Sequence, residues 1–345
     1  MTDPFVQVTP PAAPRALVIF AGALAVTCLS PTSCGDLAAP QARTNAALRG
    51  TPGTQVLVVT ANLQEAFGRH DLRRLREIEV FVERLLPRIP YGPDVLLLQE
   101  VRHKSARKVA RQLSAQTGIS YGVAMDPGGN PWRETSRRVI RRDTAIVINR
   151  HTMVEAQGGF VPTSYAGRHG RPGTKEPQKL QVKQNAHALV RKRGTGVRLA
   201  VVSVHWPGRR MATRRLGNLY GVRWSRKIAE FLARRYPRTD QDNAARVIAG
   251  DFNRKSHAKQ PSERRRPKPF WRVLTHEPHD YRDAVWMVDA RPGNKDIVNG
   301  GVDYIFARAR VSRAGVDSAY DRRKALGNPR KYYADHRFRW ALITP

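Results

Sequence analysis

The sequence predicts an α/β fold in which helices cover sheets with both parallel and antiparallel strands. Two kinds of segment follow Gly53: short apolar runs rich in β-branched residues, which favour strands, and longer stretches with apolar residues at helical spacing. The turn Gly194-Thr195-Gly196 joins two of the short runs directly, as in a hairpin, whereas helices separate others. Hairpins combined with helical crossovers favour layers around mixed sheets over a simple doubly wound sheet.

The expected strands are short, mostly apolar runs without helical spacing. In chain order they are residues 55–60, 94–98, 144–148, 187–190, 197–204, 246–249, 302–307 and 337–343. The second of these is continuously apolar from Val95 to Leu98, so we expect it to be buried. In the last, Phe338, Trp340 and Leu342 fall on one face, because side chains alternate along a strand.

Three segments are expected to be helices, because their apolar residues recur every three or four positions. They are residues 71–86, 105–117 and 211–236, followed by the helix-ending residues Pro87, Gly118 and Pro237. Three other segments, rich in Gly, Pro and basic residues, are expected to be surface loops: residues 127–142, 163–184 and 254–269. No linker or internal repeat interrupts the chain past Gly53, so we expect a single domain over residues 55–345.

Residues 1–54 are expected to be a signal peptide or membrane anchor followed by a flexible linker. Arg15 precedes an apolar run of about 14 residues, which is shorter than the ~20 that span a bilayer but typical of a signal-peptide core. Small residues suited to cleavage follow at Ala38 and Ala39, and Cys34 is a possible lipidation site, although Pro31 fits that pattern poorly. The protein is therefore expected to be secreted or membrane-tethered, with an uncleaved anchor or a low-complexity tail as the alternatives.

The chain carries a formal net charge of +33, with 61 Lys and Arg against 28 Asp and Glu. Such a surface attracts a polyanion, either nucleic acid or an anionic membrane, although a general Arg-rich bias would also explain part of the charge. Arg predominates in runs such as Arg264-Arg265-Arg266, and its planar guanidinium binds phosphate in a bidentate way. The two cysteines, Cys28 and Cys34, precede the expected domain, which excludes a thiolate nucleophile, a disulfide or a cysteine zinc site within it.

Polar side chains stand at the ends of several expected strands, where a sheet can hold them rigidly against a substrate. In chain order they are Asn62, Glu100, His205, Asp251, Asn253, Asp303, Asp335 and His336. Each has a structural explanation when taken singly, such as an ion pair for Glu100 or a turn for Asn62. Together they offer acids, amides and histidines without cysteine, a set that suits a hard ion such as Mg²⁺ or Mn²⁺ and the hydrolysis of a phosphate ester.

Two local patterns within this set bear on geometry. Asp251 and Asn253 flank Phe252, so an extended backbone would send both polar side chains to one side and the ring into the core. The preceding Gly250 leaves room for a close approach. Asp335 and His336 are adjacent, so a bend is needed for both to reach one site.

This order of motifs resembles the endonuclease/exonuclease/phosphatase superfamily, the metal-dependent phosphodiesterases similar to deoxyribonuclease I. The resemblance covers the chain from about Gln55 to Pro345. The segment His205-Trp206-Pro207-Gly208-Arg209 is most similar to exported bacterial members, although Gly208 stands where a serine is common. The resemblance implies a four-layer sandwich of two mixed β-sheets packed face to face, with helices outside and the site at one rim.

The resemblance also implies which residues bind the metal ion and which contact the substrate. Glu100 would be the main ligand of Mg²⁺ or Mn²⁺, with Asn62 and Asp335 close by. The basic pair Arg209 and Arg210 would contact the substrate phosphate.

The remaining residues are implied to act on the phosphodiester itself. Asp303 would orient His336, and that pair, or Asp251, would activate the attacking water. Asn253 and His205 would hold the phosphoryl oxygens as negative charge develops.

In the deoxyribonuclease branch a second acid supports the histidine at the His205 position. The sequence offers Asp126 and Glu134 as candidates for that acid.

The sequence therefore predicts an exported, divalent-metal-dependent nuclease that cleaves DNA or RNA by in-line attack of an activated water. One alternative is a phospholipid or inositol-phosphate phosphoesterase docked on an anionic membrane, but no contiguous apolar loop suited to membrane insertion is visible in the sequence. A further alternative is a non-catalytic, basic nucleic-acid-binding protein. No protein partner is expected.

Overall fold

The computed structural model describes residues 45–64, 71–128, 132–168, 178–207, 214–237, 244–254, 268–284, 302–317, 328, 331, 333–334 and 336–345. All described residues belong to one compact unit, Ala42–Pro345. Residues 1–44 of the expected leader lie outside the described residues. This unit includes residues ahead of the expected domain start at Gln55: Thr51 is buried and its hydroxyl bonds the Asp94 carboxylate at 2.6 Å.

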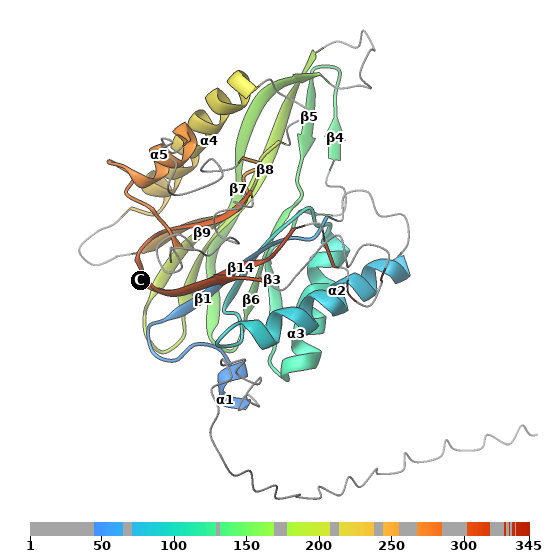
Figure 1. Cartoon of the computed structure of the whole chain (residues 1–345), viewed down its shortest axis with the longest axis vertical. Helices are drawn as coiled ribbons and strands as arrows, with labels where there is room; N and C mark the ends of the chain where they lie inside the picture. The colour runs from blue at the N-terminus through green and yellow to red at the C-terminus, as the bar shows by residue number, and fades with distance from the viewer. Residues whose placement is uncertain are drawn as a thin grey trace, which may run out of the picture. The chain divides into compact units, whose positions relative to one another are not determined.

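Two mixed β-sheets form the centre of the described part of this unit (Figure 1). The first has six strands in the order β13-β14-β1-β2-β6-β3. The second has eight strands in the order β11-β12-β10-β9-β8-β5-β4, with β7 paired to β8 off this path. The pairs β1–β2, β9–β10 and β5–β8 are parallel and the others are antiparallel. The predicted mixed sheets are confirmed.

The strands of the first sheet are β1 (Val56–Asn62), β2 (Val95–Gln99), β3 (Tyr121–Met125), β6 (Thr144–Asn149), β13 (Arg310–Val316) and β14 (Arg339–Thr344). Those of the second are β4 (Trp132–Glu134), β5 (Arg138–Arg141), β7 (Met153–Arg168), β8 (Gln178–Lys192), β9 (Arg198–His205), β10 (Ala245–Asp251), β11 (Arg282–Asp283) and β12 (Asp303–Arg308). The helices are α1 (Asn45–Leu48), α2 (Asp71–Leu85), the 3₁₀ turn η2 (Leu86–Arg88), α3 (His103–Thr117), α4 (Arg214–Arg235) and α5 (Pro269–Thr275).

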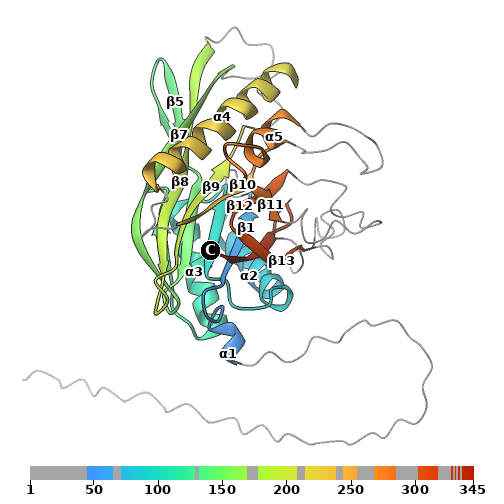
Figure 2. The ribbon, with the colours of Figure 1, turned by 90° about the vertical axis from the view of Figure 1, so that its left-hand side faces the viewer.

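Three apolar clusters arrange these elements in four layers (Figures 1 and 2). One cluster packs α2 and α3 against the first sheet, and includes Phe81 and Leu57. The second fills the space between the sheets, where Val58 and Val201 are both buried. The third packs α4 and α5 against the other face of the second sheet. Because both faces of β1 and β2 are covered, nearly every side chain is buried, which explains their continuous apolar runs.

The three predicted helices are confirmed, with ends within three residues of the expected ones. Gly118 ends α3 with a φ of 68°, and its N–H bonds the carbonyl of Ser114, as a glycine in the left-handed region commonly does. Pro87 falls in the 3₁₀ turn that follows α2, where its missing N–H is tolerated. No described helix is both long enough and apolar enough to cross a membrane.

Two of the predicted loops are wrong, because strands occupy much of them. The segment 127–142 contains β4 and β5, and the segment 163–184 contains the end of β7 and the start of β8. β5 and β8 pair with each other, so backbone hydrogen bonds to a distant segment, rather than apolar composition, hold these residues extended. Of the third predicted loop, residues 255–267 lie outside the described residues, and α5 begins at Pro269.

Candidate active site

Strand ends from both sheets meet at one rim of the sandwich. In the first sheet, Asn62 is the last residue of β1 and Glu100 directly follows β2, with which β1 is parallel. In the second sheet, Asp251 at the end of β10 pairs with His205 at the end of β9 and with Asp303 at the start of the antiparallel β12. Strand direction therefore brings residues that are far apart in the sequence to the same edge.

Buried polar contacts join the two sheets directly beneath this rim. The Gln99 side chain donates from Nε2 to the Ser203 hydroxyl at 2.9 Å, and that hydroxyl donates to the Leu98 carbonyl, also at 2.9 Å. Both side chains are fully buried, so each hydrogen bond offsets the cost of removing a polar group from water. These contacts fix the position of Glu100 on one sheet relative to His205 on the other.

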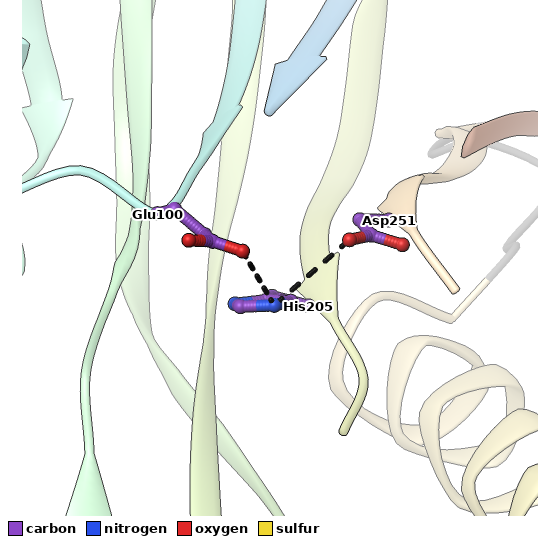
Figure 3. A group of neighbouring side chains, drawn as sticks. All are labelled: Glu100, His205 and Asp251. Atoms are coloured by element: carbon purple, nitrogen blue, oxygen red, sulfur yellow. Dashed lines mark ion pairs between the residues drawn. The ribbon is translucent and has the colours of Figure 1, made fainter. Parts of the chain in front are cut away.

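Glu100, His205 and Asp251 face one another across the rim (Figure 3). The Glu100 Oε1 atom lies 3.4 Å from His205 Nε2, which in turn lies 3.9 Å from Asp251 Oδ2. The Asn62 side chain donates from Nδ2 to Glu100 Oε1 at 3.2 Å and to Asp251 Oδ2 at 3.0 Å. Glu100 has a φ of +53°, a region that is costly for a non-glycine residue and is found most often at functional sites.

Asn253 orients Asp251. Its backbone N–H donates to Asp251 Oδ1 at 2.6 Å, and its Nδ2 donates to Asp251 Oδ2 at 3.0 Å and to the Trp206 carbonyl at 2.6 Å. Phe252 is turned into the core, as expected from the spacing. Gly250 has a φ of +142°, and a Cβ there would lie 2.0 Å from the Val204 carbonyl oxygen, so only glycine fits.

A histidine–aspartate pair completes this side of the rim. His336 Nδ1 lies 2.9 Å from Asp303 Oδ2, and His336 Nε2 lies 3.9 Å from Asp251 Oδ2. The second carboxylate oxygen of Asp303, Oδ1, is buried and has no hydrogen-bond partner among the described residues.

The acid that supports His205 is Asp143, not the predicted Asp126 or Glu134. Asp143 Oδ2 lies 2.8 Å from His205 Nδ1. Asp126 instead contacts His103, and Glu134 is exposed on β4. The one signal of Asp143 in the sequence is its position directly before the apolar run of β6, a position that turn residues also occupy.

Two cations lie beside Asp143. Lys183 Nζ lies 3.2 Å from Asp143 Oδ2 and 3.1 Å from His205 Nδ1, and Arg141 Nε lies 2.5 Å from the same carboxylate oxygen. Burial alone would raise the pKa of Asp143, but His205, Lys183 and Arg141 together hold that pKa well below its usual range. Burial lowers the pKa of Lys183 to about 8, although Asp143 opposes this shift.

The pKa values of the two carboxyls that face His205 are shifted in opposite directions. Burial favours a higher pKa for Glu100, but the His205 charge and the Asn62 hydrogen bond outweigh it, and the pKa of Glu100 is lowered. Burial raises the pKa of Asp251 to about 6; Asp303 adds to this rise, and His336 and His205 oppose it. Both carboxyls are therefore ionised at neutral pH, and Asp251 takes up a proton as the pH falls through about 6.

Two groups of side chains could hold a metal ion among the described residues. One is Glu100, His205 and Asp251, and the other is Asp251, Asp303 and His336; within each group one potential ligand atom per residue lies within 4.8 Å of the others. Carboxylate oxygens are the donors that hard divalent cations prefer, so the residues fit such an ion. The predicted metal ligand Asp335 and the predicted phosphate contacts Arg209 and Arg210 lie outside the described residues.

A model of the Endonuclease/Exonuclease/phosphatase family matches residues 59–336, a span that begins just before Asn62 and ends at His336. The chain belongs to this family. Endonuclease/exonuclease/phosphatase proteins are generally hydrolases that act on phosphoester bonds, and the resemblance seen in the sequence is confirmed. No curated protein matches the chain.

Solved structures of the endonuclease/exonuclease/phosphatase family share the fold at low identity. A family protein from Bacteroides thetaiotaomicron is 14% identical, with a TM-score of 0.53 over 86% of this chain and 100% of that one. The human Nocturnin catalytic domain with bound sulfate is 14% identical, with a TM-score of 0.51 over 84% and 94% of the two chains. TDP2 from D. rerio, complexed with a single-strand DNA product, is 12% identical, with a TM-score of 0.51 over 85% and 100%.

Proposed function

We propose that this protein is an exported, divalent-metal-dependent nuclease. The observation that carries the proposal is the convergence of Asn62 and Glu100 from one sheet with His205, Asp251 and His336 from the other. Two further facts support nucleic acid as the substrate: the net charge of +33, and the single-strand DNA product bound to a protein of the same fold.

Glu100 and Asn62 would hold Mg²⁺ or Mn²⁺, with Asp335 as a further proposed ligand. When bound, the ion would neutralise negative charge that develops on the phosphate. The ionised Glu100 carboxylate suits this role, because its lowered pKa leaves it without a proton at neutral pH.

His336 would accept a proton from the attacking water. Its Nδ1 bonds Asp303, which favours the tautomer with the proton on Nδ1 and leaves Nε2 facing Asp251 at the rim. Asp251, 3.9 Å from Nε2, is the alternative base and would also orient the attacking water.

His205 is held by Asp143 in the same manner, with Nε2 directed towards Glu100 and Asp251. From this position it would hold a phosphoryl oxygen as charge develops. Both N–H bonds of the Asn253 carboxamide are used by Asp251 and Trp206, so the geometry favours a positioning role for Asn253 over the predicted contact with the phosphate.

We expect the purified protein to cleave plasmid, linear duplex DNA, single-stranded DNA or RNA at low salt with Mg²⁺, and to lose this activity with a chelator. Sphingomyelin and a phosphoinositide belong in the same panel, since they test the phospholipid alternative. Turnover of those lipids above that of every nucleic acid would overturn the proposal. The absence of any chelator-sensitive hydrolysis would instead favour a non-catalytic binding protein.

The phospholipid alternative has less support. Among the described residues, the exposed large hydrophobic side chains are Leu75, Leu180 and Leu219, which lie on separate elements. They do not form the contiguous apolar loop that insertion into a bilayer would need.

Export by residues 1–54 remains part of the proposal. We expect the full chain, made in a bacterial host with a Sec pathway, to reach the periplasm or the membrane fraction. A chain that starts at Ala42, the first residue of the compact unit, is the control and should stay in the cytoplasm. Equal distribution of the two chains would contradict the export proposal without affecting the nuclease proposal.

A further inference from the structure

Four strands of the second sheet continue beyond the active site (Figures 1 and 2). β7 pairs with β8 along its whole length and occupies one edge of it. The other edge is shared: residues 186–191 of β8 pair with β9, and residues 180–183 pair with β5. We call β4, β5, residues 163–168 of β7 and residues 178–183 of β8 the basic arm.

The pairing partner of β8 changes from β9 to β5 beside the active site, so the basic arm starts at the site. Between the two paired stretches of β8, Asn185 accepts the His205 backbone N–H at 3.1 Å. At the C-terminal end of β5, Arg141 contacts Asp143, and Lys183 on β8 contacts the same carboxylate. These buried contacts attach the arm firmly to the residues that support His205.

The described surface of the arm carries unneutralised positive charge. From Trp132 to Arg142 the sequence has five arginines and one glutamate. Arg133, Arg137 and Arg138 are exposed, and none of the three forms an ion pair with a described residue. Arg133 pairs opposite Ile140, so it shares a face of the arm with Arg138, two residues from Ile140.

The arm has the length and charge to contact several phosphates. Arg138 precedes Asp143 by five residues, which is roughly 16 Å of extended chain at about 3.3 Å per residue. Duplex DNA carries about one negative charge per 1.7 Å of axis, so this length of duplex presents roughly nine charges. Membrane insertion is less favoured, because Leu180 is the single exposed large hydrophobic among those residues of the arm whose side chains the structure describes.

We propose that the basic arm binds the phosphate backbone of a nucleic acid beside the bond that is cleaved, so that the substrate is a polymer rather than a mononucleotide. This inference rests on the proposed nuclease function. Arg133, Arg137 and Arg138 provide the contacts, and the arm acts on substrate binding without taking part in the chemistry.

The test is binding of a fluorescent 30-bp DNA duplex at several KCl concentrations, with EDTA present so that no cleavage occurs. The arm variant is R133Q/R137Q/R138Q. The matched control is R191Q/R310Q/R313Q, which removes three equally exposed arginines. Their register places them away from the site, since Arg191 lies near the far end of β8 and Arg310 pairs with Thr344 at the far end of β14.

The plot of log K against log salt has a negative slope, and each lost phosphate contact reduces the magnitude of that slope by about 0.9. One lost contact also weakens the affinity about eightfold at 0.1 M salt. We expect the slope of the arm variant to fall by about 2 to 3, and that of the control by less than about 1. The variant R133K/R137K/R138K keeps the charge and should bind within a few-fold of wild type. Equal slopes for the arm and control variants would overturn the proposal.

Two further measurements separate this inference from the nuclease proposal. With Mg²⁺ present, the arm variant should hydrolyse bis(p-nitrophenyl) phosphate within about twofold of wild type but lose at least about tenfold in kcat/KM on duplex DNA. Loss of activity on both substrates would contradict a pure binding role.

Binding to phosphatidylserine vesicles that depends on the arm, with duplex binding unchanged, would show that the arm docks on membranes instead. If the wild-type protein cuts no nucleic acid but binds it through the arm, the nuclease proposal fails and the proposed binding role of the arm stands.

Discussion

We expect Glu100→Gln to lose about 10³-fold or more in kcat/KM on nucleic acid, which corresponds to about 4 kcal/mol of transition-state stabilisation. The substitution keeps the size of the side chain and its contact with Asn62, but removes the negative charge that would hold the metal ion. Glu83→Gln on α2 removes an exposed carboxylate and is the matched control. Mn²⁺ binding, followed by electron paramagnetic resonance, should weaken in the first variant and not in the second.

The pH dependence of the same reaction offers a second check. Burial raises the pKa of Asp251 to about 6, so this carboxyl gains a proton as the pH falls through about 6. A cation at the rim would have to displace that proton, so we expect Mn²⁺ affinity and activity to fall below about pH 6. Glu100, with its lowered pKa, should not limit binding in this range.

An E100Q variant with wild-type activity would contradict every enzymatic interpretation of this site.

The residues of the rim were predictable because both faces of the central strands are buried. A strand that is buried on both faces reads as an uninterrupted apolar run, so the polar residues directly after it stand out, as Gln99 and Glu100 do after Val95–Leu98. Asp303 and His336 stand at the starts of strands instead: Asp303 begins β12 and His336 precedes β14, and these strands run antiparallel to β10 and β1, so they begin at the same rim.

Asp143 follows the same geometry but was missed. β6 is antiparallel to β2, with Thr144 opposite Gln99, so the residue before β6 lies beside the residue after β2. No local pattern marks Asp143 as different from a turn residue, and its neighbours Arg141 and Lys183 sit in segments with a loop-like composition. The parallel pairing of β5 with β8 brings these residues together, and such a pairing between distant segments leaves no signal in either one.

We expect Asp143→Asn to impair both stability and catalysis, for different reasons. Lys183 is buried, so removal of the Asp143 charge leaves this cation without the counter-charge that it contacts. Breaking a buried ion pair in this way costs about 3–5 kcal/mol. His205 would also lose the anion that fixes its ring, and we expect kcat to fall by at least about 10²-fold.

The double variant D143N/K183M separates the two effects. It removes Lys183 as well, so most of the stability lost in D143N should return, whereas the activity should not. Unfolding in urea measures the first, and hydrolysis of duplex DNA the second. If the double variant is as unstable as D143N, burial of the unpaired lysine is not the cause of the loss. If D143N keeps wild-type kcat, His205 does not depend on this carboxylate.

The pH dependence of stability gives an independent test of the same pair. Because the pKa of Asp143 lies well below its usual value in the folded protein, its contribution to stability is complete at neutral pH. That contribution is lost only as the pH falls below about 3.8 towards the folded-state pKa, where wild type takes up a proton at Asp143 and comes to resemble the neutral variant. We therefore expect the difference in unfolding free energy between wild type and D143N to be constant from pH 5 to 7 and to narrow in stronger acid. A difference that already shrinks at pH 6 would show that Asp143 is not held ionised by His205, Lys183 and Arg141.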